Sequence, residues 1–240
     1  MLSELFRRLR PIPAFDAPAP ETRLSVIGDV HGRAELLTKA LDRTIGQVIL
    51  VGDYIDRGEH SADVLRLLME RPDLVCLMGN HEEMLLRTLD DPQRNGSRWL
   101  RYGGLQTMAS FGVSGVAETT SGPALTDARD RLAERMGPDM IAWLRALPSV
   151  WQSGNVVVTH AGANPAHPIK DQDSKALRWG HPDFRRTARK DGLWVVHGHY
   201  VTEHPVMEKG RINVDTGAYT TGKLTVAHFE DTNVSFEAVS

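Results

Sequence analysis

The chain has 240 residues and a formal net charge of -3, from 28 lysines and arginines against 31 aspartates and glutamates. This balance lacks the basic excess of a nucleic-acid-binding protein, so we expect no nucleic acid partner. Apolar residues make up 41% and charged residues 25% of the chain, which is ordinary for a globular protein with a large buried core. No apolar run approaches the length of a membrane span.

Cysteine usage and the first residues indicate the compartment. Cys76 is the only cysteine, so no intramolecular disulfide can form, which fits a reducing compartment. The arginines at positions 7, 8 and 10 precede no apolar core of the kind that a secretory signal needs. We therefore expect a cytoplasmic protein.

Residues 1–22 are predicted to form a peripheral arm. Apolar residues at positions 2, 5, 6 and 9 have helical spacing, and a proline-rich stretch at 11–20 ends that pattern. Contact of this short basic helix with a membrane or a partner is the less favoured alternative to simple surface packing. Residues 23–240 are expected to form one domain.

Short apolar runs recur from residue 24 onward, and each is followed by glycine or histidine. Runs of branched residues that end in turn residues predict buried strands. They occupy residues 24–27, 48–51, 74–78, 156–159 and 193–196. Helical patterns at 34–43 and 61–70 separate the first three runs. This alternation predicts parallel βαβ units of an α/β fold, with both faces of the sheet covered.

The remaining segments follow two other patterns. The region of about 83–150 is helical, with helices expected near 83–89, 99–108, 128–136 and 139–147, and we interpret it as an insertion beside the sheet. Residues 211–239 alternate apolar and polar side chains. That alternation predicts antiparallel strands at 212–214, 224–228 and 234–238.

Potential metal ligands stand at or just after the ends of the predicted strands. They are Asp29, His31, Asp53, Asn80, His81, His160, His197 and His199. Because the carboxyl ends of parallel strands meet at one edge of a sheet, we expect these side chains to converge. Carboxylate, amide and imidazole donors together suit divalent manganese, iron or zinc, and a thiolate-type zinc site is not expected.

Three motifs in a fixed order make this pattern specific. They read GDVHG at 28–32, GDYIDRG at 52–58 and GNHE at 79–82. The series resembles the signature of the phosphoprotein phosphatase family, the serine/threonine phosphatase type of calcineurin-like metallophosphoesterase, in its prokaryotic form. His160 and His199 resemble the two later histidine ligands of that family, so the likeness extends from about residue 24 to residue 219.

The resemblance implies a fold and a metal centre. The fold would be a central mixed β-sandwich flanked by helices, with the helical insertion beside it. Two divalent cations would be bound, with manganese preferred and iron or zinc as alternatives. The implied ligands are Asp29 and His31 for the first metal, Asp53 as the bridge, and Asn80, His160 and His199 for the second metal. His197 would support the site rather than bind a metal.

The resemblance also implies a direct hydrolysis. A hydroxide that bridges the two metals would attack phosphorus without a covalent enzyme intermediate. His81 would protonate the leaving oxygen, and Asp56 would orient its imidazole and favour the protonated form. Arg57 would grip the phosphate oxygens, with Asn80 also at the substrate.

One segment departs from the family pattern. Where relatives have Trp-x-Arg, this chain has Trp179-Gly180-His181, so the second phosphate-binding arginine is missing from its usual place. Arg178 and Arg185 are the two candidates to replace it, and the sequence does not choose between them.

These motifs favour a serine/threonine protein phosphatase that acts on phosphoproteins or small phosphoesters. The alternative is a nucleotide hydrolase of the symmetric diadenosine tetraphosphatase type, because that type shares the motifs. A metal-binding regulatory module without catalysis is disfavoured, since Asp56, Arg57 and His81 are all present. The sequence leaves the physiological substrate and the oligomeric state open.

Overall fold

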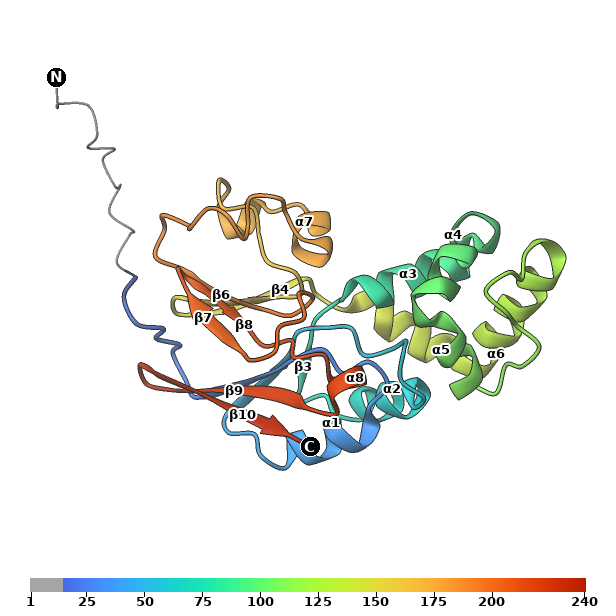
Figure 1. Cartoon of the computed structure of the whole chain (residues 1–240), viewed down its shortest axis with the longest axis horizontal. Coiled ribbons are helices and arrows are strands. Elements are labelled where there is room, and N and C mark those ends of the chain that lie inside the picture. Colours follow the sequence, from blue (N-terminus) through green and yellow to red (C-terminus); the bar gives the residue numbers. More distant parts are fainter. Residues whose placement is uncertain (1–14) are drawn as a thin grey trace, which may run out of the picture.

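The computed structural model describes residues 15–240, and two five-stranded mixed sheets face each other at its centre (Figure 1). The first sheet has the order β10 (Asn233–Val239), β9 (Leu224–Glu230), β1 (Leu24–Ile27), β2 (Gln47–Leu50) and β3 (Val75–Cys76). The second has the order β4 (Val150–Ser153), β5 (Val156–Thr159), β6 (Trp194–His197), β8 (Arg211–Asn213) and β7 (Val206–Glu208). The helix predicted within residues 1–9 lies outside the described residues.

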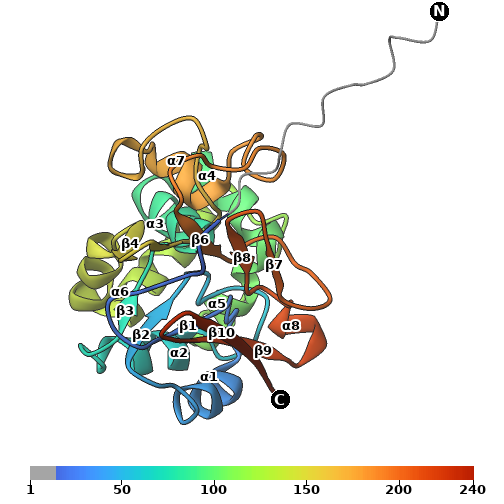
Figure 2. The same cartoon turned by 90° about the vertical axis from the view of Figure 1, so that its left-hand side faces the viewer.

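Helices cover the outer face of each sheet, so the molecule has four layers (Figure 2). α1 (Ala34–Leu41) and α2 (Ser61–Met69) pack on the first sheet. α7 (Ser174–Trp179) and the 3-10 turn Ile169–Asp171 pack on the second. This arrangement confirms the predicted mixed sandwich flanked by helices.

The alternation of side chains along the central strands builds the core on both sides of the first sheet. Val26 and Ile49 point into the layer between the sheets, where they join Ile212 of β8. Their neighbours Ile27 and Leu50 point into the layer below, against α1 and α2. Because both faces are buried, these strands read as continuous apolar runs, which is the pattern that identified them in the sequence.

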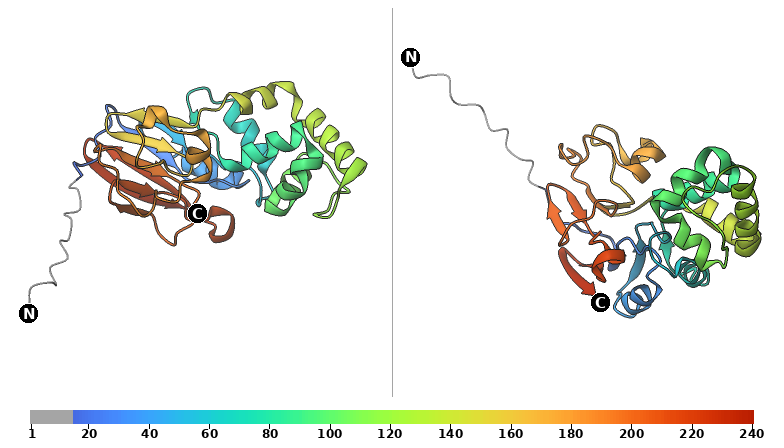
Figure 3. Two further views of the ribbon diagram at one scale, coloured as in Figure 1. Left: turned by 90° about the horizontal axis from the view of Figure 1, so that it is seen from above. Right: turned by 45° about the vertical axis from the view of Figure 1, so that its right-hand side comes forward.

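The helical insertion lies at one end of the sandwich (Figures 1 and 3). It comprises α3 (Asn80–Asp90), α4 (Pro92–Trp99), a π-helical turn (Leu100–Gly104), α5 (Leu105–Ser110) and α6 (Gly122–Ala146). The helices expected at 128–136 and 139–147 are the two halves of α6, which is interrupted at Gly137 with a φ of 76°. Pro138 follows this glycine and removes a backbone donor from the helix.

The C-terminal strands correct one prediction. β9 and β10 form an antiparallel hairpin, as expected, whereas β8 pairs antiparallel with β7 but parallel with β6, and so belongs to the second sheet. Alternation along a strand indicates which face is buried and not which strand lies alongside, so the sequence pattern could not identify this partner. The edge strands β4 and β7 and the short α8 (Ala218–Thr221) were not predicted, because they are short and partly exposed.

The described part of the N-terminal arm is attached to the second sheet. Phe15 packs on Trp194 of β6, with ring centroids 5.4 Å apart. The indole N–H of Trp194 donates to the carbonyl of Asp16 at 2.7 Å, and Asn155 bonds with the backbone of residues 17 and 19. Within residues 15–240, no helix is both long and apolar enough to cross a membrane.

Candidate metal centre

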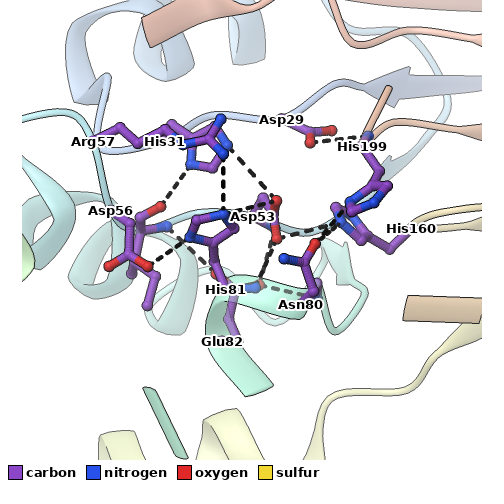
Figure 4. A network of polar contacts seen from close by, with 12 residues as sticks. Asp29, His31, Asp53, Asp56, Arg57, Asn80, His81, Glu82, His160 and His199 are labelled. Carbon is purple, nitrogen blue, oxygen red and sulfur yellow. Dashed lines mark hydrogen bonds and ion pairs between the residues drawn. The ribbon is translucent and has the colours of Figure 1, made fainter. Parts of the chain in front are cut away.

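The ends of five strands meet at one edge of the sandwich and bring the predicted ligands together (Figure 4). β1, β2 and β3 run parallel, so the segments after them carry Asp29, Asp53 and Asn80 to the same edge. β5 and β6 are parallel in the opposite sheet and deliver His160 and His199. The site therefore lies between the carboxyl ends of both sheets, where ligands of α/β proteins bind.

Asp53 lies at the centre of two groups of ligand atoms. In one group its Oδ2 is 3.7 Å from Nε2 of His31 and 3.9 Å from Nε2 of His81. In the other its Oδ1 is 3.4 Å from Nε2 of His160, with His199 beside it. Within each group the ligand atoms lie within 4.8 Å of one another. Two clusters that share one carboxylate have the composition of a bimetallic site.

Asn80 completes the second group. Its Oδ1 lies 2.8 Å from Nε2 of His160 and 2.8 Å from Nδ1 of His199. An amide oxygen and two imidazole nitrogens therefore face a common point beside Asp53. Oxygen and nitrogen donors of this kind suit manganese, iron or zinc.

Asp29 supplies a direct test of whether the residues fit a cation. Its Oδ2 accepts the backbone N–H of His199 at 3.0 Å, but its buried Oδ1 has no hydrogen-bond partner among residues 15–240. Burial, reinforced by Asp215 and Asp53, raises the pKa of Asp29 well above its usual value. A buried carboxylate oxygen without a partner is costly, and a divalent cation would satisfy it. The residues present fit the predicted metal centre.

The buried histidines and Asp53 shift each other's charge states. Burial opposes ionisation of Asp53, but His160 and His81 outweigh it and hold the pKa of Asp53 well below its usual value. Burial also opposes protonation of His160, yet Asp53 raises the pKa of His160 to about 9. Burial lowers the pKa of His31 to about 3 and that of His199 to about 4. Those two imidazoles are neutral near pH 7, as a metal ligand requires.

The loops of the site carry strained backbone. Five of its residues other than glycine have φ between 45° and 71°, in the left-handed region, and only Lys209 and Asp231 share this among the other non-glycine residues described. The five are His31, Asp53, Asp56, Arg57 and His199. Strain of this kind costs roughly 1–3 kcal/mol at each residue and clusters at functional sites.

Glu82 holds two of these loops together, a role that the sequence did not reveal. Its buried carboxylate accepts the backbone N–H groups of Asp53 at 2.9 Å, Tyr54 at 2.8 Å and Gly79 at 3.0 Å. A side chain at Gly79 would place its Cβ 2.2 Å from Oδ1 of Asp53, so only glycine fits there. The position of Glu82 in the GNHE motif was its only sequence signal.

His81 also takes part in a second arrangement, with Asp56 and Arg57. Nδ1 of His81 lies 2.6 Å from Oδ2 of Asp56, so its Nε2 faces the centre of the site. Burial lowers the pKa of His81, but Asp53 and Asp56 outweigh burial and raise it. Nη2 of Arg57 lies 3.4 Å from this Nε2, and its guanidinium lies over the ring of Tyr219 at 4.5 Å.

The two candidate arginines occupy different surroundings. Nε of Arg178 donates to Oγ of Ser149 at 2.8 Å, and its Nη1 is 3.5 Å from a carboxylate oxygen of Glu83. The guanidinium of Arg185 lies over the ring of Tyr200 at 5.2 Å. That ring in turn packs edge-on against His199, with centroids 4.9 Å apart. Arg178 is thus engaged by the protein, whereas Arg185 lies over a ring that itself contacts a residue of the second ligand group.

Two further histidines lie outside the ligand groups. Nδ1 of His197 donates to the carbonyl of Gly198 at 2.9 Å, and its ring packs against Phe184. Burial lowers the pKa of His197 to about 4. Nδ1 of His181 accepts the backbone N–H of Asp183 at 3.2 Å.

Comparison with known proteins assigns the family. Residues 22–206 match the calcineurin-like phosphoesterase family. The chain belongs to this family. The motifs therefore identified the family correctly, and this metallophosphoesterase is a hydrolase of phosphate esters. Members bind two metal ions, and the two ligand groups around Asp53 offer histidine and aspartate ligands for such a centre.

Individual relatives carry two kinds of name. Serine/threonine-protein phosphatase 2 of Salmonella typhimurium is 36% identical over 217 residues, which cover 83% of this chain and 89% of that protein. The protein of the same name in Escherichia coli is 43% identical over 84 residues, but this match spans only 33% of this chain and 37% of that protein. Bis(5'-nucleosyl)-tetraphosphatase PrpE [asymmetrical] of Oceanobacillus iheyensis is 26% identical, with 87% and 89% covered.

A solved structure supports the fold. A protein serine/threonine phosphatase from Saccharomyces cerevisiae superposes with a TM-score of 0.60 at 18% identity, covering 92% of this chain and 80% of that one. At 18% sequence identity the likeness supports a shared fold and carries no information about the substrate. The likeness agrees with the two mixed sheets and flanking helices described above.

Proposed function

We propose that this phosphoesterase is a cytoplasmic serine/threonine protein phosphatase that hydrolyses phosphomonoesters. The observation that carries the proposal is the pairing of His81 with Asp56, next to Arg57 and beside two ligand groups that share Asp53. A phosphomonoesterase needs an anion grip, a proton donor and metal ligands around one point, and this arrangement supplies all three. The Salmonella relative, similar over most of both chains, supports a phosphoprotein as the substrate.

The ligands are assigned as the family resemblance implies, and the two groups around Asp53 support the assignment. We assign Asp29 and His31 to the first metal, Asp53 to both, and Asn80, His160 and His199 to the second. We assign His81 as the proton donor and not as a ligand of the first metal, as its place in the GNHE motif implies; its Nδ1 is bonded to Asp56, so Nε2 faces the site. Two divalent cations, manganese in our proposal with iron or zinc as alternatives, would polarise the phosphate and lower the pKa of a water molecule.

The chain's own residues then bind and protonate the substrate. Arg57 would hold two phosphate oxygens, with its guanidinium kept in place by the face of Tyr219. Asn80 would also contact the phosphate. His81 would pass its Nε2 proton to the leaving oxygen, while Asp56 accepts the Nδ1–H and so stabilises the imidazolium that carries both protons.

A side-by-side substrate panel tests this proposal. Purified protein reconstituted with manganese should release phosphate from phosphoserine and phosphothreonine peptides faster than from diadenosine tetraphosphate. Phosphate and nucleotide products would be measured in the same preparation. If only the dinucleotide is hydrolysed, the protein phosphatase assignment is wrong and the nucleotide hydrolase assignment replaces it.

A cavity beside the metal centre favours the nucleotide hydrolase as the second candidate. Its volume is about 600 Å³, and Trp179, Tyr200, Arg185 and Arg186 are among the residues that line it. Aromatic faces and guanidinium groups stack with nucleobases and bind additional phosphates. The similarity to the tetraphosphatase of Oceanobacillus iheyensis points in the same direction.

Arg185 is the proposed second phosphate ligand in place of the family arginine. We expect Arg185→Ala to raise KM for phosphomonoesters about 10-fold, because a hydrogen bond to a charged group is worth about 1.5–3 kcal/mol. Arg178→Ala should change KM less, since Arg178 is already engaged by Ser149 and Glu83. Steady-state kinetics on both variants checks this expectation. A larger rise of KM in Arg178→Ala would reverse the assignment.

A further inference from the structure

The carboxylate of Asp56 is held from the side opposite His81 by two residues of the helical insertion. The indole N–H of Trp99, the last residue of α4, is 2.9 Å from Oδ2 and 3.1 Å from Oδ1 of Asp56. The hydroxyl of Thr107, in α5, donates to Oδ1 at 2.6 Å. All three side chains are fully buried. With Nδ1 of His81 at 2.6 Å, Asp56 has three side-chain partners that fix both of its oxygens.

The insertion also holds the backbone that carries these groups. The N–H of Asp56 lies 3.0 Å from Oγ1 of Thr107, and the N–H of Arg57 donates to the carbonyl of Gly103 at 3.2 Å. Asp56 and Arg57 have φ of 71° and 68°, in the left-handed region where side chains are strained. A Cβ at Gly103 would lie 2.6 Å from the nitrogen of Arg57, so the insertion approaches this loop as closely as glycine permits.

We propose that Trp99 and Thr107 are positioning residues for proton donation by His81. They fix the orientation of the Asp56 carboxylate, and that carboxylate fixes the ring of His81 so that Nε2 points into the site (Figure 4). This inference rests on the proposed function, because it assigns a purpose to residues that act on the proposed acid. The helical insertion then contributes to the chemistry of the site.

The alternative is that both residues only fill the core of the insertion. Packing alone does not require a buried indole N–H and a buried hydroxyl to converge on one carboxylate. A buried carboxylate does need such donors, because losing one leaves it partly unsatisfied and free to rotate. Rotation of Asp56 would turn His81 away from the leaving oxygen, and a displacement of about 1 Å at a reacting group costs on the order of 10²-fold in rate.

The dependence of kcat on the leaving group distinguishes a positioning role of Trp99 and Thr107 from a packing role. Phenyl phosphate needs a proton on its departing oxygen, whereas the nitrophenolate of p-nitrophenyl phosphate departs without one. In Trp99→Phe and Thr107→Val we expect kcat on phenyl phosphate to fall about 10-fold or more and kcat on p-nitrophenyl phosphate to fall less than about 3-fold. Thr107→Ser keeps the hydroxyl and should restore the wild-type ratio of the two rates.

Matched controls remove an equivalent bond elsewhere in the chain. Trp194→Phe deletes an indole N–H that donates to a backbone carbonyl beside the second sheet, and Thr88→Val deletes a buried hydroxyl bonded within α3. Both should leave the ratio of the two rates unchanged. Thermal unfolding of all variants would be measured alongside the kinetics. If Trp99→Phe is destabilised, Thr107→Val still tests the inference, because valine has nearly the same shape as threonine.

The outcomes distinguish this inference from the function on which it rests. If His81→Ala loses phenyl phosphate turnover selectively while Trp99→Phe and Thr107→Val lose both rates equally or neither, the positioning role is overturned and the proposed function stands. If His81→Ala itself lowers both rates equally, the assignment of His81 as the acid fails, and the positioning role fails with it. Selective loss in all three variants supports both proposals.

Discussion

Asp53→Asn should lower kcat by about three orders of magnitude, because metal ions contribute several kcal/mol of charge stabilisation and each 1.4 kcal/mol is a factor of 10 in rate. The carboxylate of Asp53 lies between the two ligand groups, 3.7 Å from Nε2 of His31 and 3.4 Å from Nε2 of His160. Asparagine keeps the size and the oxygen that accepts the backbone N–H of His81, but it removes the negative charge. The variant should therefore fold and bind less than two metal ions per chain.

Metal content and turnover have to be measured on the same preparation. Elemental analysis after dialysis gives the number of bound ions, and phosphate release gives kcat. Asp90→Asn is the matched control, because Asp90 is an exposed carboxylate of α3 paired with Arg145, away from the ligand groups. An Asp53→Asn protein that keeps two metal ions and wild-type turnover would show that Asp53 does not bridge the centre.

His81→Ala should lower turnover of substrates with poor leaving groups by about 10² to 10⁴-fold, which is the usual contribution of a general acid. Nε2 of His81 faces the site because Nδ1 is bonded to Asp56 at 2.6 Å. The loss should shrink on p-nitrophenyl phosphate, since its leaving group needs no proton. KM should change little, because His81 acts on the leaving oxygen while Arg57 holds the phosphate.

The same variant decides between two roles for His81. His81 lies near enough to Asp53 and His31 to be grouped with them as a possible ligand. If His81 binds a metal, the His81→Ala protein should hold one ion fewer, and turnover of all substrates should fall by the same factor. If it is the acid, the variant should retain both ions. His204→Ala, at an exposed histidine away from the ligand groups, controls for loss of an imidazole as such.

The helical insertion contacts the loop that carries Asp56, the residue that orients His81. From the sequence, Trp99 is interpreted as a core residue of the helical insertion, with the border of the substrate cleft as the alternative. In the folded chain it ends α4 directly beside the loop after β2, and its one polar atom meets Asp56.

The sequence by itself determined the family and the set of residues that gather at the site. This was possible because each ligand follows a short strand buried on both faces, and such strands are visible as apolar runs that end in glycine or histidine. Asp29, Asp53 and Asn80 are therefore placed by local pattern alone, once the strands are known to be parallel. The sequence predicts that these strands are parallel, because a helix connects each one to the next.

Only the tertiary structure decided which distant groups act on one another. β8 joined the second sheet because pairing depends on neighbours in space, which alternation along a strand does not specify. The separate environments of Arg178 and Arg185, and the bonds from Trp99 and Thr107 to Asp56, likewise depend on how the insertion and the loop after α7 pack against the sandwich. Side-chain hydrogen bonds between residues some 40 to 50 positions apart leave no periodic trace in a sequence, because they need a single residue at each end and a fold that brings the two together.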